Sequence, residues 1–254
     1  MSTAVVFLGP TLSLEQARGV ADCIYLPPAA QGSVIAAVQR YSPAAILVID
    51  GVFQSEPALR HKELLWAMAQ GIAVFGAASM GALRAAELFP AMQGVGLIYR
   101  WYRRFPFLPD DAVAVIHAPS ELGSKALTLA HVDLRLTARA AARRGKLTAA
   151  EAELIISSSL RLNFRERTLE AIIGAADLQT PDRPAAWWIA RLRSALVEQK
   201  KRDALAALRL IGKSNLRRRA PGKFVITAAF LRDVAAAGLH LPLQPSAPVK
   251  RIFP

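Results

Sequence analysis

The sequence predicts an α/β protein, in which a doubly wound, mainly parallel sheet of Rossmann-like topology is followed by a helical C-terminal region. Over the first half of the chain, short apolar runs of strand length alternate with helix-length segments, which is the order typical of parallel sheets. Beyond Pro119 the pattern becomes helical. The chain has 254 residues, of which 53% are hydrophobic, enough for a large buried core.

Four strands are predicted in the first half, each as a short apolar run. These runs are residues 4–8, 24–26, 45–49 and 72–75. The third is apolar at every position, as expected of a central strand. Helices are predicted between the strands, at residues 14–20, 33–41 and 57–70. Ser13 is expected to cap the first helix and Gly71 to close the third. A further strand is predicted at residues 113–116.

The second half is predicted to be helical, with a turn-rich linker at residues 177–184. Helices are expected at residues 124–144, 148–160, 163–173, 185–211 and 227–237. Thr148 and Glu151 have the spacing of a capping box. The pattern divides the chain into an α/β core (1–120), a helical extension packed on it (121–176), and a basic helical region with a proline-rich tail (185–254).

Positive charge is concentrated in the second half. Residues 1–120 hold eight Lys/Arg and eight Asp/Glu, whereas residues 121–254 hold twenty-four and eleven, which accounts for the whole net charge of +13. This split favours an acidic protein or peptide as partner of the helical half. Nucleic acid is disfavoured, because aromatic residues do not interleave the basic ones. The alternative is that the basic residues only solvate helix faces.

Several other classes of protein are disfavoured by the sequence. No apolar run is long enough to span a membrane, and the N-terminus lacks the basic start of a secretory signal. Cys23 is the single cysteine, so we expect a reducing, cytoplasmic location and a buried, inert thiol. No metal-ligand cluster, phosphate loop or dinucleotide fingerprint is present. We therefore expect no metal and no cofactor.

The stretch 71–88 carries the most specific signal. An apolar strand is followed at once by a helix, through a turn of small residues that holds Ser79. Ala77-x-Ser79-x-Gly81 approaches the Gly-x-Ser-x-Gly nucleophile elbow. The N–H groups of Met80 and Gly81 at the helix start favour an anion or a developing oxyanion. Three interpretations stay open: Ser79 is a nucleophile, part of an oxyanion site, or a plain helix N-cap.

Several motifs together resemble the TfuA-like core domain family. This resemblance is carried by the runs VFLGPTL (6–12), LPPA (26–29), IDGVF (49–53), HKELL (61–65), GAASMGALRAAEL (76–88) and DDxVAVxH (110–117). It covers roughly residues 4–125. It implies a partner of YcaO-type enzymes, which activate a peptide amide so that its oxygen is exchanged for sulfur, giving a thioamide. It also implies that the protein supplies sulfide by hydrolysing a thiocarboxylated sulfur-carrier protein, with a precursor peptide as a further candidate partner.

Thiocarboxylate hydrolysis needs a nucleophile, a base and oxyanion donors. Ser79 is the candidate nucleophile. His61 or His117 is the candidate base, oriented by Asp50 or Asp111. Because ligands of parallel sheets bind at the carboxyl ends of the strands, we expect Ser79 in one cleft with Asp50 and one of the two histidines.

Further polar residues on the predicted helices are candidates for substrate binding, together with Met80 and Gly81. The planar guanidinium of Arg84 is suited to bind a substrate carboxylate through two hydrogen bonds. Alternatively, Arg84 pairs with Glu87, three residues later on the same helix. Lys62 and Glu63 line the rim of the cleft, or only solvate their helix. Two other functions stay open: an adaptor that recruits or activates the YcaO-type enzyme without catalysis, and a generic serine hydrolase.

Overall fold

The computed structural model describes residues 4–53, 56–118 and 126–241. These residues form a five-stranded sheet in the order β2-β1-β3-β4-β5, with every neighbouring pair parallel. The strands are β1 (Ala4–Phe7), β2 (Ile24–Leu26), β3 (Ala45–Val48), β4 (Ala73–Ala77) and β5 (Gln93–Val95). This is the flavodoxin-like order of doubly wound sheets, so the predicted fold class is confirmed. Strand β5 was not predicted, because three residues that include a glycine give little periodic signal.

Helices follow the strands and then continue alone through the second half. They are α1 (Leu14–Arg18), α2 (Ser33–Tyr41), α3 (His61–Ala69), α4 (Met80–Glu87), α5 (Leu97–Arg104), α6 (His131–Arg143), α7 (Ala149–Arg161), α8 (Leu169–Ala175), α9 (Ala185–Arg193), α10 (Gln199–Lys213) and α11 (Ala228–Ala236). The predicted caps are confirmed: Ser13 accepts a hydrogen bond from the Gln16 N–H, and Thr148 and Glu151 form a capping box. None of these helices is long and apolar enough to cross a membrane.

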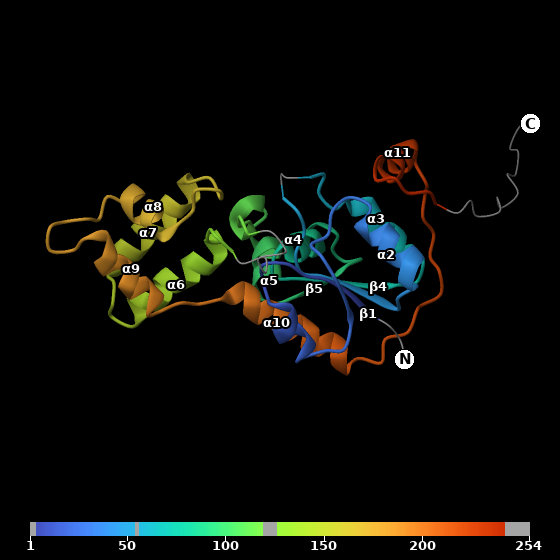
Figure 1. Cartoon of the computed structure of the whole chain (residues 1–254), viewed down its shortest axis with the longest axis horizontal. Coiled ribbons are helices and arrows are strands. Elements are labelled where there is room, and N and C mark those ends of the chain that lie inside the picture. Colours follow the sequence, from blue (N-terminus) through green and yellow to red (C-terminus); the bar gives the residue numbers. More distant parts are fainter. Residues whose placement is uncertain (1–3, 54–55, 119–125, 242–254) are drawn as a thin grey trace, which may run out of the picture.

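Both faces of the sheet are covered, and the C-terminal region contributes to each (Figure 1). Helices α2 and α3 pack on one face, where Phe230 and Val234 of α11 join the same apolar cluster. On the other face, α1 packs beside α10, which buries Leu208 and Ile211 against the strands. Helices α10 and α11 of the basic helical region therefore belong to the core of the sheet domain.

Helices α6 to α9 lie at one end of the molecule, beyond α5, and have an apolar core of their own (Figure 1). Trp188 and Ile155 are among its buried residues. Helix α10 leads from this group back under the sheet.

Three predictions between residues 113 and 173 were wrong. Residues 110–113 form a 3₁₀ turn and residues 114–116 pair with no strand, because the N–H of Ile116 is bound to the Thr128 hydroxyl at 2.8 Å. The helix predicted from residue 124 begins at His131; residues 124–125 lie outside the described residues, as does almost all of the proline-rich tail. Asn163 caps only a local turn, through the N–H of Arg165, and the next helix begins after Thr168.

The long helix predicted at residues 185–211 was also wrong, because it is broken into α9 and α10. The break comes where the N–H of Val197 donates to the Thr137 hydroxyl at 3.0 Å, and Ala195 and Val197 are buried in the helical core. A tertiary hydrogen bond thus replaces the helical one, and the chain turns back toward the sheet.

Candidate functional site

Ser79 lies on a sharp, strained turn between β4 and α4. Ala78 has φ of 65°, in the left-handed region that residues with a side chain rarely adopt. The N–H of Ser79 donates to the carbonyl of Ala77 at 2.8 Å, so the chain reverses over three residues. Strain of this kind persists only where the surrounding structure imposes it, and it is common at functional sites.

The surrounding structure imposes the turn through close packing of glycines. A Cβ atom on Gly81 would lie 1.8 Å from the carbonyl oxygen of Val48, and one on Gly76 would lie 2.0 Å from that of Gly81. Helix α4 therefore begins directly against β3 and β4. The N–H of Gly81 donates to the carbonyl of Ile49 at 3.2 Å and is not free for a ligand. The N–H of Met80, by contrast, has no acceptor among the described residues.

The Ser79 hydroxyl does not cap the helix that it precedes. Ser79 occupies the N-cap position, and its carbonyl accepts from the N–H of Ala82, but its side chain accepts no capping hydrogen bond. Its Oγ instead donates to the carbonyl oxygen of Val113, at 3.5 Å. Residues 110–113 thus approach Ser79 from a part of the chain that no local pattern connects with it.

A cleft of about 260 Å³ opens at the carboxyl ends of β1, β3 and β4. Asp50, Ser79, Met80 and His117 all line it, and Ser79 is 8% exposed. Further walls come from Phe53, Val113, Phe164 and Arg165. The strand order reverses between β1 and β3, so the cleft lies at the switch point where doubly wound sheets bind ligands.

Asp50 holds the loop after β1. Its carboxylate accepts hydrogen bonds from the N–H of Gly9 (2.9 Å), the N–H of Thr11 (3.2 Å) and the Thr11 hydroxyl (2.6 Å). Only 2% of Asp50 is exposed. These contacts fix the wall of the cleft. No histidine among the described residues hydrogen-bonds to Asp50, so it orients neither candidate base.

His117 lies at the mouth of the cleft, with an exposed ring. Its Nδ1 lies 2.9 Å from the carbonyl oxygen of Ala118. Because a carbonyl can only accept, the proton of the neutral ring is on Nδ1 and Nε2 is left as the basic nitrogen. The partner of Nδ1 is therefore a backbone carbonyl and not a carboxylate.

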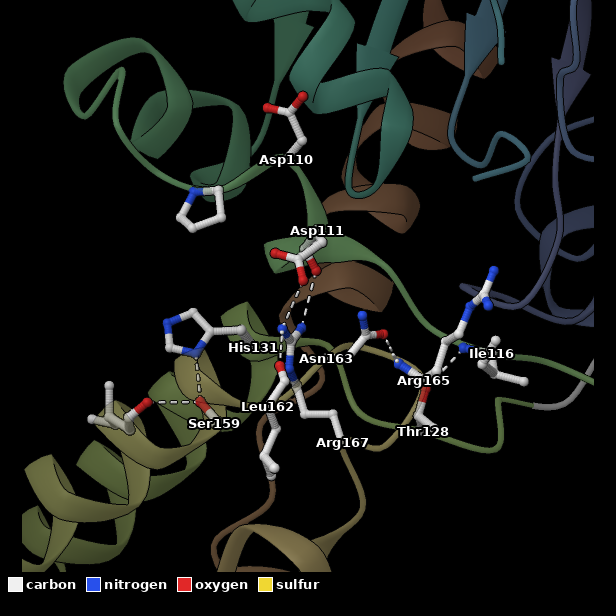
Figure 2. A network of polar contacts seen from close by, with 12 residues as sticks. Asp110, Asp111, Ile116, Thr128, His131, Ser159, Leu162, Asn163, Arg165 and Arg167 are labelled. Atoms are coloured by element: carbon white, nitrogen blue, oxygen red, sulfur yellow. Dashed lines mark hydrogen bonds and ion pairs between the residues drawn. The ribbon is translucent and has the colours of Figure 1, made fainter. Parts of the chain in front are cut away.

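Asp111 belongs to a structural ion pair (Figure 2). The guanidinium of Arg167 donates to its carboxylate at 3.0 Å, and also to the backbone carbonyls of Asp111 (3.0 Å) and Leu162 (3.1 Å). Arg167 is buried, so this pair ties the 3₁₀ turn to the segment before α8. Asp111 therefore holds the wall of the cleft and does not line it.

His61 lies outside the residues that line the cleft. Its Nε2 is 2.8 Å from a Glu87 carboxylate oxygen, and Arg84 donates to that same oxygen at 2.6 Å. Burial raises the pKa of Glu87, but the hydrogen bonds from His61 and Arg84 outweigh it and leave the pKa below its ordinary value. Arg84 is thus occupied by Glu87 and by the carbonyl of Leu59, to which its Nε donates at 3.1 Å.

Two more predicted substrate contacts also lie away from the cleft. The ammonium of Lys62 donates to the Thr227 hydroxyl at 2.8 Å, next to α11. Glu63 is 1% exposed and caps its own helix through the N–H of Arg60. Cys23 is only half-buried; burial, and then the charge of Asp22, raise the pKa of its thiol.

Sequence reasoning missed the residues that reach the site from far along the chain. Phe164 and Arg165 line the cleft, and Arg167 and Lys200 bind its wall from behind. No local sequence pattern marks these residues as part of a site. Lys200, for example, belongs to a basic run that is typical of a solvent-exposed helix face. Among the described residues, no group of three or more His, Cys, Asp or Glu side chains is placed to hold a metal ion.

Fold and site together define a doubly wound α/β protein with a serine at a strand–helix turn in its switch-point cleft. Residues 50–168 match the family model described as TfuA-like protein, so the chain contains a TfuA-like domain. This match includes Asp50, Ser79, His117 and Arg167. A search of curated proteins gives no match. The TfuA-like family is associated with YcaO-dependent thioamidation.

Proposed function

We propose that this protein supplies sulfide to a YcaO-type enzyme in thioamide formation, by hydrolysing a thiocarboxylated sulfur-carrier protein. The observation that carries the proposal is the cleft at the β1/β3 switch point. It holds Ser79 on a strained turn that the Met80 N–H directly follows in the chain, and His117 lines the same cleft. A nucleophile, an oxyanion donor and a base are the groups that acyl transfer requires.

The reaction balances with these groups and one water molecule. Ser79 Oγ attacks the thiocarboxylate carbon, its proton passes to Nε2 of His117, and the carbon–sulfur bond breaks. Sulfur leaves with that proton as hydrosulfide, and the acyl group stays on Ser79 as an ester. Water then cleaves the ester, which gives the carboxylate and a proton and restores the hydroxyl. The N–H of Met80 donates to the tetrahedral oxyanion in both steps.

An adaptor without catalytic activity is the second candidate, and one observation favours it. Ser79 donates to a carbonyl oxygen at 3.5 Å, and no histidine among the described residues hydrogen-bonds to it. In this alternative the cleft binds the end of the carrier or precursor peptide and presents it to the YcaO-type enzyme.

Sulfide release from a thiocarboxylated carrier protein tests the proposal directly. Wild-type protein is expected to release sulfide, and Ser79→Ala and His117→Ala are each expected to slow release by roughly 100-fold or more. His61→Ala is the matched control, because His61 pairs with Glu87 outside the cleft, and it is expected to retain activity. Circular dichroism and thermal unfolding must first show that each variant is folded.

Other outcomes discriminate between the alternatives. Wild-type protein that releases no sulfide but accelerates thioamidation by its YcaO-type partner would support the adaptor. Loss of activity in His61→Ala but not in His117→Ala would contradict the assignment of the base. Activity retained in Ser79→Ala but lost in His117→Ala would make an activated water the nucleophile.

A further inference from the structure

Lys200 is a buried lysine whose ammonium group lies behind Ser79. It is the second residue of α10 and only 5% exposed. Its Nζ donates to the carbonyl oxygen of Val113 at 2.8 Å. This is the oxygen to which the Ser79 hydroxyl donates at 3.5 Å. The ammonium and the hydroxyl, 121 positions apart in the sequence, therefore meet at one backbone oxygen.

The charge of this ammonium is not balanced by a direct ion pair. No carboxylate among the described residues lies within ion-pair distance of Nζ. The carboxylate of Asp133 is close by, but it accepts the backbone N–H of Lys200, at 3.0 Å. Burial raises the pKa of Asp133 to about 6, with the charge of Lys200 opposing that rise.

An ammonium group has three N–H donors, and the contact with Val113 uses one. The other two have no acceptor among the described residues. A buried cation with unused donors is costly unless an anion completes its shell. The burial and the unused donors together point to a bound anionic ligand.

Space for such a ligand is present. A second cavity of about 190 Å³ is lined by the cationic residues Lys200 and Lys201, by Thr11 and Thr128, and also by the carboxyl-bearing residues Asp133 and Glu198. It shares Pro10 and Val115 with the Ser79 cleft, so the two cavities adjoin. Lys200 lines this second cavity and Ser79 lines the cleft, and the Val113 carbonyl oxygen to which both donate lies between them.

We propose that Lys200 binds the anionic end of the ligand, a peptide C-terminal carboxylate or thiocarboxylate. The inference rests on the proposed function for the identity of the chain end, and it assigns a site residue outside the matched segment 50–168. Neutralising the negative charge of a thiocarboxylate also makes its carbon a better target for Ser79. The C-terminal region thus completes the site that the family-matched segment builds.

Two ligands that differ only in terminal charge test the inference. Acetyl-Gly-Gly-Gly with a free carboxylate and the same peptide as a carboxamide are each titrated into the full chain, and binding is followed by NMR. Wild type is expected to bind the carboxylate about 10-fold or more tightly, as a charge-assisted hydrogen bond in a buried site allows. In Lys200→Gln, which can still donate to the Val113 carbonyl, this preference is expected to vanish.

Arg202→Gln is the matched control, because it removes one positive charge from an exposed position of the same helix and should keep the preference. The comparison uses two ligands on the same variant, so partial loss of folding weakens both alike and does not mimic the result. A preference that is absent from wild type, or that survives in Lys200→Gln, would overturn the inference.

These outcomes are separate from those of the proposed function. The peptides carry no sulfur and undergo no hydrolysis, so a protein that releases no sulfide can still show the Lys200-dependent preference. Conversely, sulfide release by wild type with no effect of Lys200→Gln on the peptide preference would leave the proposed function standing and remove this site.

Discussion

Glu63 is a carboxyl group with almost no access to water. It lies in α3 against α2, and its Oε2 has no hydrogen-bond partner among the described residues. Burial raises its pKa to about 6, despite nearby N–H groups that lower it. The ionised form is therefore less stable in the folded protein than in the unfolded chain, where the pKa is near its ordinary value of 4.5.

The sign of the resulting pH dependence follows from linkage. The folded state holds the Glu63 proton to higher pH than the unfolded chain, so this residue makes the free energy of unfolding fall as pH rises from about 4.5 to about 6. We expect Glu63→Gln to remove that loss. Relative to wild type, the variant should gain about 2 kcal/mol between pH 4 and pH 7.

Urea unfolding at the two pH values measures this change, with Glu166→Gln at an exposed position as the control. A difference between Glu63→Gln and wild type that stays constant over the range would show that Glu63 does not titrate in this way.

At the scale of the element, the contact of α4 with the sheet decides where the site forms. The strand–turn–helix unit is local in sequence, but the position of Ser79 depends on two glycines that allow the backbones to meet. Strand β3 supplies the other side of this contact, through the carbonyls of Val48 and Ile49. Helix α4 and the ends of two strands therefore act as one rigid support for the cleft.

Gly81→Ala is expected to destabilise the protein by about 3 kcal/mol, because its Cβ would overlap a backbone carbonyl that cannot turn aside. The same change should slow sulfide release, since the start of α4 must move. Gly174→Ala, in α8, is the matched control. Nothing lies within 4 Å of its added Cβ, so this variant should be more stable by about 0.5–1 kcal/mol. Thermal unfolding of both variants checks the contrast, and a mild effect of Gly81→Ala would contradict it.

At the scale of the whole molecule, the chain after α9 returns to the sheet domain and wraps it. Helix α10 covers one face and α11 the other, and between them the N–H of Arg219 donates to the carbonyl of Gly71 at 2.8 Å. The group α6 to α9 is held to the sheet domain by Arg167 and by the start of α10. This path explains how Lys200 reaches a site built mainly by the first half of the chain.

The wrapping segment also presents exposed positive charge. Arg217, Arg218 and Arg219 are all exposed, but Arg218 also donates from Nε to the carbonyl of Pro43 at 3.0 Å, a contact with the sheet domain. If this surface docks an acidic carrier or YcaO-type enzyme, the double variant Arg217→Glu with Arg219→Glu should weaken association by about 10-fold or more. Leaving Arg218 in place keeps its contact with the sheet domain intact.

Calorimetric titration at low and high salt measures this effect. Binding of wild type should also weaken as salt rises, because exposed charges are screened beyond about 8 Å at physiological ionic strength. Equal affinity at both salt concentrations, and for the double variant, would indicate an apolar interface and a merely solvating role for the basic residues.

The sequence by itself determined the features that depend on neighbours along the chain. The alternation of apolar runs defined four of the five strands, and Ser13 and the Thr148–Glu151 pair marked helix starts, because caps and periodicity act over a few residues. It also placed Ser79 at a strand–helix turn and Asp50 at the same edge of the sheet, since the strands are parallel.

Only the tertiary structure decided what surrounds that turn. It separated the two candidate histidines, with His117 at the cleft and His61 bound to Glu87, although both lie near predicted element ends. In the structure, residues 113–116 form a wall of the cleft and not a strand, and their backbone groups bind the side chains of Lys200 and Thr128. Such contacts join irregular segments that are far apart in sequence, and no local propensity or period encodes which of them will pack together.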